Sequence, residues 1–248
     1  LLGLNRLLAQ LEDRRAALEV VEKVCRSYAT MPEAHYAIAI AAASAGQGEQ
    51  ARAEARRALE LRPDWEQGAL LQTQLLFRVS AQEAADFLGD FVKKHPQAHE
   101  AGIQLARLMV SEKRFDEARR QFESVLKDKP NDPEIMFGIA LIALQQKDLK
   151  TADANFRHFL TIPAADKNPA FFFLGQIAEE DKRVDDALDY YAKVVSGEHF
   201  MSAQVRRAHL LAKQGRIEEA RAQLRNAPSL SAEERVQLTI AEAALLRE

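Results

Sequence analysis

A repeat of about 34 residues is the feature that most limits how this chain can fold. An alanine recurs after each short polar segment, with steps of 33 to 35 residues, at Ala17, Ala51, Ala84, Ala118, Ala152, Ala187 and Ala220. A second series of small residues keeps the same period half a repeat away, at Ala39, Thr73, Ala106, Ala140, Gly175 and Ala208. Two series with one period indicate a true structural repeat, because a chance match would not persist along the chain.

Each repeat unit has the pattern of two helices joined by a tight turn. In residues 32–65, Pro32 suits the first position of a helix, and Tyr36, Ile40 and Ala43 keep helical spacing before a turn at residues 46–49. We expect the recurring small residues where the two helices cross, since a larger side chain would hold the helix axes apart. One hairpin cannot bury its apolar face alone, so stacked neighbours are expected to complete the core.

Composition agrees with a helical fold and excludes several classes of function. The chain is 47% hydrophobic and 29% charged, with only 10 Gly and 8 Pro, and it lacks the β-branched runs typical of strands. A net charge of −3 offers no electrostatic reason to expect nucleic acid as a partner. No apolar run approaches the roughly 20 residues that a membrane-spanning helix needs, so this segment is not expected to insert into a membrane.

The chain resembles the tetratricopeptide repeat (TPR) family. The family places a small residue in the first helix, an alanine early in the second, a bulky residue four positions later and a closing proline, which stand here as Ala106, Ala118, Phe122 and Pro130. The resemblance implies an all-α fold, a right-handed TPR superhelix of stacked antiparallel helix pairs, whose first helices line the concave surface. The tryptophan that is usual in the family is absent, with His35, Met136 and Phe171 in its place.

The repeat spacing predicts a single array over residues 1–248. The expected units cover residues 1–31, 32–65, 66–98, 99–132, 133–167, 168–200 and 201–230, with a partial unit at 231–248. The first unit keeps only residues 1–11 of its first helix. Near the other end, Ser231 and Glu234 form a predicted capping box before a helical pattern at Val236, Ile240, Ala243 and Leu246. We therefore expect the chain to be a segment of a longer protein.

The chain carries no pattern typical of catalysis. It contains no G-x-S-x-G motif, no Walker-type phosphate loop and no Cys-x-x-Cys pair. His95 and His99 lie on opposite sides of Pro96, so they do not share one helical face as metal ligands would. We therefore expect a protein that is not an enzyme, with no catalytic residue, no metal and no cofactor.

The predicted first helices carry a stripe of side chains that would face the concave groove. Its members keep i, i+4, i+7 spacing and are Tyr36, Ile40, Leu70, Gln74, Phe77, Ile103, Arg107, Val110, Phe137, Leu141, Leu144, Phe172, Gln176, Glu179, Val205 and His209. A contiguous apolar groove usually marks a binding site. The alternative for the aromatic members is that they pack between neighbouring repeats as part of the core.

These features predict a scaffold or adaptor that binds a peptide or a partner protein in the concave groove. Related co-chaperones clamp a C-terminal carboxylate with lysines and asparagines, whereas this stripe carries apolar residues such as Leu70 and Ile103. An amphipathic helix or an apolar extended peptide is therefore the expected ligand. Two alternatives are a non-catalytic TPR arm of a larger enzyme and a structural spacer that associates with itself.

One stretch carries a narrower resemblance. Residues 172–180 and 197–200 are similar to proteobacterial outer-membrane TPR adaptor lipoproteins. That resemblance implies a periplasmic scaffold tethered to the outer membrane by a lipid outside this chain. The cytoplasm is the alternative location.

Overall fold

The computed structural model describes residues 13–163, 165–228 and 231–245 of the 248. Within these ranges it contains fourteen α-helices, one short 3₁₀ helix and no strand, which confirms the all-α prediction. The elements are α2 (Arg14–Cys25), η1 (Arg26–Tyr28), α3 (Pro32–Ser44), α4 (Gly48–Leu61), α5 (Glu66–Phe77), α6 (Ala81–Lys94), α7 (His99–Ser111), α8 (Phe115–Leu126), α9 (Pro133–Gln145), α10 (Leu149–Thr161), α11 (Asn168–Glu180), α12 (Val184–Ala192), α13 (Phe200–Lys213), α14 (Ile217–Asn226) and α15 (Ala232–Leu245). The helical stub expected at residues 1–11, and Leu246, lie outside the described residues.

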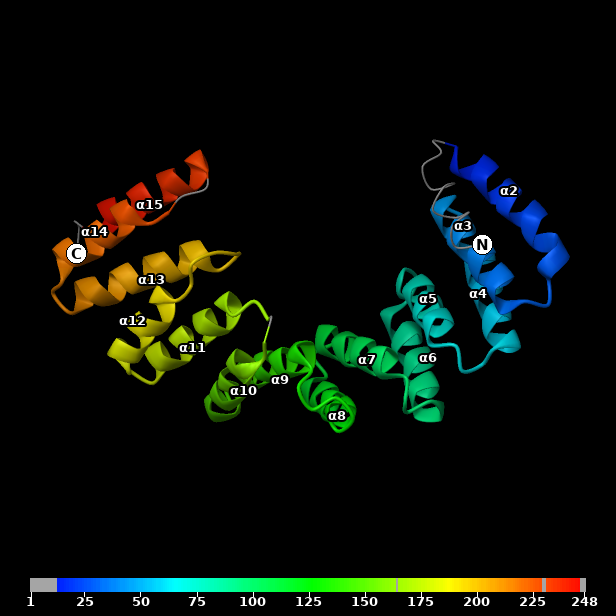
Figure 1. The fold of residues 1–248 in the computed structure, drawn as a ribbon, viewed down its shortest axis with the longest axis horizontal. Coiled ribbons are helices and arrows are strands. Elements are labelled where there is room, and N and C mark those ends of the chain that lie inside the picture. Colours follow the sequence, from blue (N-terminus) through cyan, green and yellow to red (C-terminus); the bar gives the residue numbers. More distant parts are fainter. Residues whose placement is uncertain (1–12, 164, 229–230, 246–248) are drawn as a thin grey trace. The chain divides into compact units, whose positions relative to one another are not determined.

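Successive helices form hairpins that stack on their neighbours. The contacting pairs are α3 with α4, α5 with α6, α7 with α8, α9 with α10, α11 with α12, and α13 with α14. Four second helices also contact the first helix of the next pair: α4 with α5, α6 with α7, α10 with α11 and α12 with α13 (Figure 1). We call α3, α5, α7, α9, α11 and α13 the first helices, and their partners the second helices.

The chain divides into two compact units, residues 1–128 and 129–248. Unit 1 contains α2 to α8, and its buried clusters include Leu18, Leu75 and Leu88. Unit 2 contains α9 to α15, and a buried cluster around Tyr191, Leu211 and Leu224 joins its later helices. Each unit therefore has a hydrophobic core of its own.

Small residues occupy the crossings between paired helices, as predicted. Six of the seven recurring alanines, from Ala51 to Ala220, are completely buried. A Cβ atom on Gly175 would lie 2.5 Å from Cε1 of Tyr191, and one on Gly102 would lie 2.8 Å from Cγ2 of Val125. These distances are too short for real carbon contacts, so the absence of a side chain sets how closely the helices approach.

Most first helices end in the same turn, in which one residue adopts the left-handed conformation. These residues are Gly46, Lys113, Lys147, Lys182 and Gly215, with φ between 59° and 78°. The amide of the following residue donates a hydrogen bond back into the helix, as Asp148 N does to Ala143 O at 2.9 Å. This is the Schellman arrangement, and it satisfies carbonyl groups that the helix end would otherwise leave unpaired.

The predicted capping box at the start of α15 is confirmed. The Glu234 amide donates to Ser231 Oγ at 3.1 Å, and the Ser231 amide donates to Glu234 Oε2 at 2.9 Å. Pro32 also occupies the first turn of α3, as expected. None of the described helices is long and apolar enough to cross a membrane.

Candidate partner-binding surfaces

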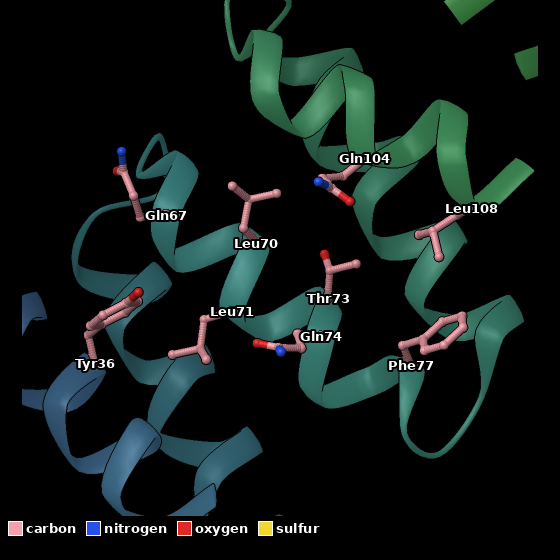
Figure 2. Close-up of a pocket in the computed structure, with 9 residues that line it drawn as sticks. All are labelled: Tyr36, Gln67, Leu70, Leu71, Thr73, Gln74, Phe77, Gln104 and Leu108. Carbon is pink, nitrogen blue, oxygen red and sulfur yellow. The ribbon is translucent and has the colours of Figure 1, made fainter. Parts of the chain in front are cut away.

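Unit 1 contains a hollow of about 550 Å³ on one side of its first helices, which we call the unit 1 hollow. Its lining comes from α3, α5 and α7: Tyr36, Gln67, Leu70, Leu71, Thr73, Gln74, Phe77, Gln104 and Leu108. Figure 2 shows Leu70 and Thr73 of α5 beside the part of α7 that carries Gln104 and Leu108, with Phe77 near Leu108. No second helix contributes a residue to this lining.

The polar groups of the unit 1 hollow are uncharged. Thr73 Oγ1 donates to Ala69 O at 2.8 Å, which occupies its only hydrogen. Gln104 Nε2 makes one long hydrogen bond, 3.3 Å, to Glu100 Oε1. The side-chain amides of Gln67 and Gln74 are exposed and have no hydrogen-bond partner among the described residues. The hollow therefore offers amide donors and acceptors on an apolar background.

An aromatic pair supports one wall of the unit 1 hollow. The ring of Tyr36 packs on Trp65 with centroids 4.8 Å apart. The guanidinium of Arg62 lies 4.8 Å from the same indole ring, and Arg62 also pairs with Glu33. Trp65 is the only tryptophan in the chain. Its fluorescence is therefore expected to respond when a ligand contacts Tyr36.

Unit 2 contains a second hollow of about 750 Å³, the unit 2 hollow. Its lining comes from α9, α11, α13 and the turn after α9: Leu141, Leu144, Gln145, Lys147, Phe173, Gln176, Ile177, Glu179, Glu180 and Arg206. Leu141 and Leu144 are half-buried. They lie at the surface of the hollow and not in the closed core.

Unlike the unit 1 hollow, the unit 2 hollow is lined partly by charged side chains. One of them, Glu179, accepts hydrogen bonds from two neighbouring side chains. Tyr191 Oη donates to Glu179 Oε2 at 2.8 Å, and Arg206 Nη1 donates to the same oxygen at 3.0 Å. Burial, followed by the carboxylate of Glu179, raises the pKa of Tyr191 well above its usual range. The buried phenol therefore stays protonated and anchors Glu179 at the edge of the hollow.

The aromatic residues of unit 2 answer the question that the sequence left open for Phe137 and Phe172. Phe137 packs against Phe156, Phe159 and Phe173, with ring centroids 5.4, 5.3 and 5.9 Å apart. Phe172 is only 6% exposed, and its ring stacks on His199 at 4.4 Å. Both side chains pack between helices, and neither lines the hollow.

Half of the predicted groove residues line the two hollows. These are Tyr36, Leu70, Gln74, Phe77, Leu141, Leu144, Gln176 and Glu179. Ile103 is buried at 2% exposure, so like Phe172 it faces the interior. The remaining predicted residues lie in first helices but line neither hollow, and they are Ile40, Arg107, Val110, Phe137, Val205 and His209.

Several lining residues were missed because they lie one position away from the predicted stripe. In α7, Gln104 lines the hollow while its neighbour Ile103 is buried. In α11, Phe173 lines the hollow while Phe172 is buried. Successive residues of an α-helix are turned by about 100°, so an error of one position moves a side chain from the groove into the core. The polarity of Gln104 was the available signal, because a glutamine at a buried position would need partners.

The described residues contain no group of three His, Cys, Asp or Glu side chains placed to hold a metal ion. The hollows are lined by apolar, amide, hydroxyl and charged groups. Such groups can bind and orient a ligand by burial, hydrogen bonding and charge pairing.

Two family models match the chain, each described as tetratricopeptide repeat, at residues 2–64 and 80–135. A TPR repeat-containing protein of Pseudomonas aeruginosa is 43% identical over 77 residues. That match covers 31% of this chain, and the chain spans only 13% of the relative's length.

Solved structures with the same fold cover most of the chain. The C-terminal part of a TPR repeat-containing protein from Cytophaga hutchinsonii has a TM-score of 0.70 at 14% identity, covering 91% of this chain and 95% of its own. Pseudomonas aeruginosa pilF has a TM-score of 0.60 at 16% identity, covering 87% of this chain and 98% of its own. At these identities the likeness concerns the fold alone. Stacked helical repeats of this kind generally present extended surfaces for binding other proteins.

Proposed function

Because the chain belongs to the tetratricopeptide repeat family, we propose that it is a protein-binding scaffold and that partner proteins bind at the hollows that the first helices line within each unit. One observation carries the proposal. Both hollows are lined by first helices, together with one residue of the turn after α9, and no second helix contributes to either. Solenoid proteins bind their partners on surfaces built from such equivalent helices.

The chemistry of the hollows favours a polypeptide ligand. Leu141, Leu144 and Phe173 in unit 2, and Leu70 and Phe77 in unit 1, present apolar surface between separated polar groups. Phe77 is 48% exposed, so part of this apolar surface is in contact with water in the free protein. A peptide that covers it gains from burying apolar area and pairs its own polar groups with those of the hollow.

The first test places two charges in the unit 2 hollow through Leu141→Glu together with Leu144→Glu. Both side chains are half-buried at an open surface, so the carboxylates stay hydrated and the fold should be retained. A bound partner would have to strip water from both charges. We expect partners captured from cells that make the protein to be lost with this double variant, with the helical circular dichroism spectrum unchanged.

The matched control is Val236→Glu together with Ile240→Glu on α15. These two side chains are 58% and 64% exposed and lie outside the hollow, and the substitution adds the same charge to the same unit. The control should capture the same partners as the unaltered chain. A folded Leu141/Leu144 variant that still captures them would place the binding site elsewhere. Unfolding of that variant would show that the two leucines belong to the core.

A further inference from the structure

We propose that His35 is a pH-sensitive latch, which holds the segment between α2 and α3 closed over Cys25 only while its imidazole carries two protons. The latch joins three parts of unit 1. The ring belongs to α3, Glu54 belongs to α4, and Ala29 lies in residues 26–31, which we call the α2–α3 connection. The inference goes beyond the proposed binding function and does not depend on it.

Both nitrogens of the His35 ring face oxygen atoms that accept hydrogen bonds. Nδ1 lies 2.6 Å from Oε2 of Glu54, and Nε2 lies 2.8 Å from the main-chain oxygen of Ala29. A neutral imidazole has one N–H and donates to only one of these oxygens, whereas the doubly protonated ring donates to both. The geometry therefore matches the charged ring, with its positive charge beside the carboxylate of Glu54.

Loss of one proton releases the contact with Ala29. A hydrogen bond to a charged acceptor is the stronger kind, so the neutral ring keeps its remaining hydrogen on Nδ1, facing Glu54. Nε2 then presents a lone pair to the lone pairs of the Ala29 oxygen, and this contact becomes repulsive. Histidine commonly changes its charge between about pH 5 and pH 8. The side chain of His35 is 14% exposed, so its proton exchanges with water while the chain stays folded.

The neighbouring elements supply no second group that takes over this role. Cys25 of α2 is the other ionisable group beside Glu54, and burial together with that carboxylate raises the pKa of its thiol. The thiol is therefore neutral throughout the range in which histidine titrates. The other ionisable side chains in this part of unit 1 are exposed to water or bonded to another side chain, among them Glu22, Arg26, Tyr28, Glu33 and Arg62.

The composition of the α3/α4 hairpin gives a polar contact unusual weight there. Its crossing is built from alanines, of which Ala39, Ala42, Ala51 and Ala55 are completely buried. The corresponding place between α11 and α12 contains the large ring of Tyr191. Because alanine buries little apolar area, the hydrophobic stabilisation of the α3/α4 crossing is smaller. One hydrogen bond is therefore a larger share of what holds this part of the chain together.

Cys25 reports whether the α2–α3 connection is closed. It is the last residue of α2, directly before residues 26–31, and it is 1% exposed. Its side chain packs with Val21, Ala34 and Ala37. The chain contains no other cysteine, so a thiol reagent labels this position alone. A reagent reaches a buried thiol only when the surrounding segment opens.

The test measures how fast dithiodipyridine labels the intact chain at pH 6 and at pH 8, on either side of the usual titration of histidine. Each rate is divided by the rate for the urea-unfolded chain at the same pH, which removes the pH dependence of the thiol itself. We expect the protection of Cys25 to fall about fivefold between pH 6 and pH 8, because one hydrogen bond is lost. Equal protection at the two pH values would overturn the inference.

Two variants separate the proton from the shape of the side chain. His35→Gln carries no charge at either pH, so its protection should be the same at both. Glu54→Gln places an amide beside Nδ1, and the neutral ring then accepts from that amide and donates from Nε2 to Ala29. Protection in Glu54→Gln should therefore stay high at pH 8. A fall in protection at pH 8 in Glu54→Gln would contradict the latch, as would a persistent pH dependence in His35→Gln.

The matched control is His158→Gln, because His158 is an exposed histidine on α10 in unit 2. It should keep the full pH dependence, and loss of the dependence in this control would assign it to another group. Nitrogen-15 NMR gives a readout that needs no substitution of His35. The histidine ring whose signals move in Glu54→Gln should carry two N–H groups at pH 6 and one at pH 8. A ring with a single N–H at both pH values would overturn the proposal.

Discussion

Gly175 shows how one missing side chain sets the distance between two helices. It lies on α11 where the ring of Tyr191 on α12 crosses, and an added Cβ would lie 2.5 and 2.6 Å from two ring atoms. Tyr191 is completely buried and its hydroxyl is bonded to Glu179. The ring therefore has little freedom to move, so the helices themselves would have to separate.

We expect Gly175→Ala to lower the free energy of unfolding by about 1–3 kcal/mol, the usual cost of overpacking a core. Gly89→Ala is the control, because Gly89 lies within α6 and an added Cβ would meet nothing within 4 Å. That change should raise stability by up to about 1 kcal/mol through helix propensity. Urea titrations of the two variants measure both effects, and a Gly175→Ala variant as stable as the Gly89→Ala variant would show that the crossing is loosely packed.

At this scale the sequence predicted the small residues more accurately than the groove. The crossing positions recur in two series of one period, so each member supports the others. The groove stripe depended on the rotation of each helix about its axis, and the pattern around Ile103 and Gln104 does not define that rotation to within one residue. Packing against the neighbouring helices determines that Ile103 is buried in the core and that Gln104 lines the hollow.

At the scale of elements, the turns after the first helices are only partly visible in the sequence. A tight turn was expected at residues 46–49, and Gly46 there has a positive φ; Gly215, Lys113, Lys147 and Lys182 adopt the same left-handed conformation at the equivalent turns. Glycine adopts that conformation without steric cost and so marks it in a sequence, whereas lysine has no such preference. The helix-ending hydrogen bonds of the Schellman turn hold the lysines in place.

We therefore expect Lys182→Gly to stabilise unit 2. Removing the Cβ relieves the left-handed strain, and the greater freedom of glycine in the unfolded chain offsets part of the gain. The net increase in the free energy of unfolding should be about 0.5 kcal/mol. Gly215→Lys makes the opposite change at the equivalent turn and should be destabilising. Thermal unfolding compares the two, and a destabilised Lys182→Gly variant would show that the lysine side chain stabilises its turn.

For the whole molecule, the repeat period predicted the fold class because every helical repeat must bury the same faces against its neighbouring repeats. The period could not reveal that the contacts divide into two compact units at residues 128 and 129. All repeats have nearly the same length, whereas the division between the compact units depends on how much surface each pair of neighbouring repeats buries. The repeat pattern also does not predict the ligand. The residues that line the hollows differ from one repeat to the next, whereas the small residues at the helix crossings recur.

If each unit has a sufficient core of its own, residues 129–248 should fold in isolation. Their buried cluster joins α11 to α15, and the rings of Phe137 and Phe156 link α9 to α10 in the same unit. We expect this segment to be helical by circular dichroism and to unfold cooperatively. Gly175→Ala should lower its free energy of unfolding by the same amount as in the full chain, since stability in stacked repeats is a sum of local terms.

A shorter segment, residues 150–248, begins inside the unit. It would lack Phe137 and expose Phe156, which is otherwise completely buried. It should therefore unfold at a lower urea concentration. Equal midpoints for the two segments would mean that α9 adds nothing to the stability of unit 2, and an unfolded 129–248 segment would mean that this unit requires the rest of the chain.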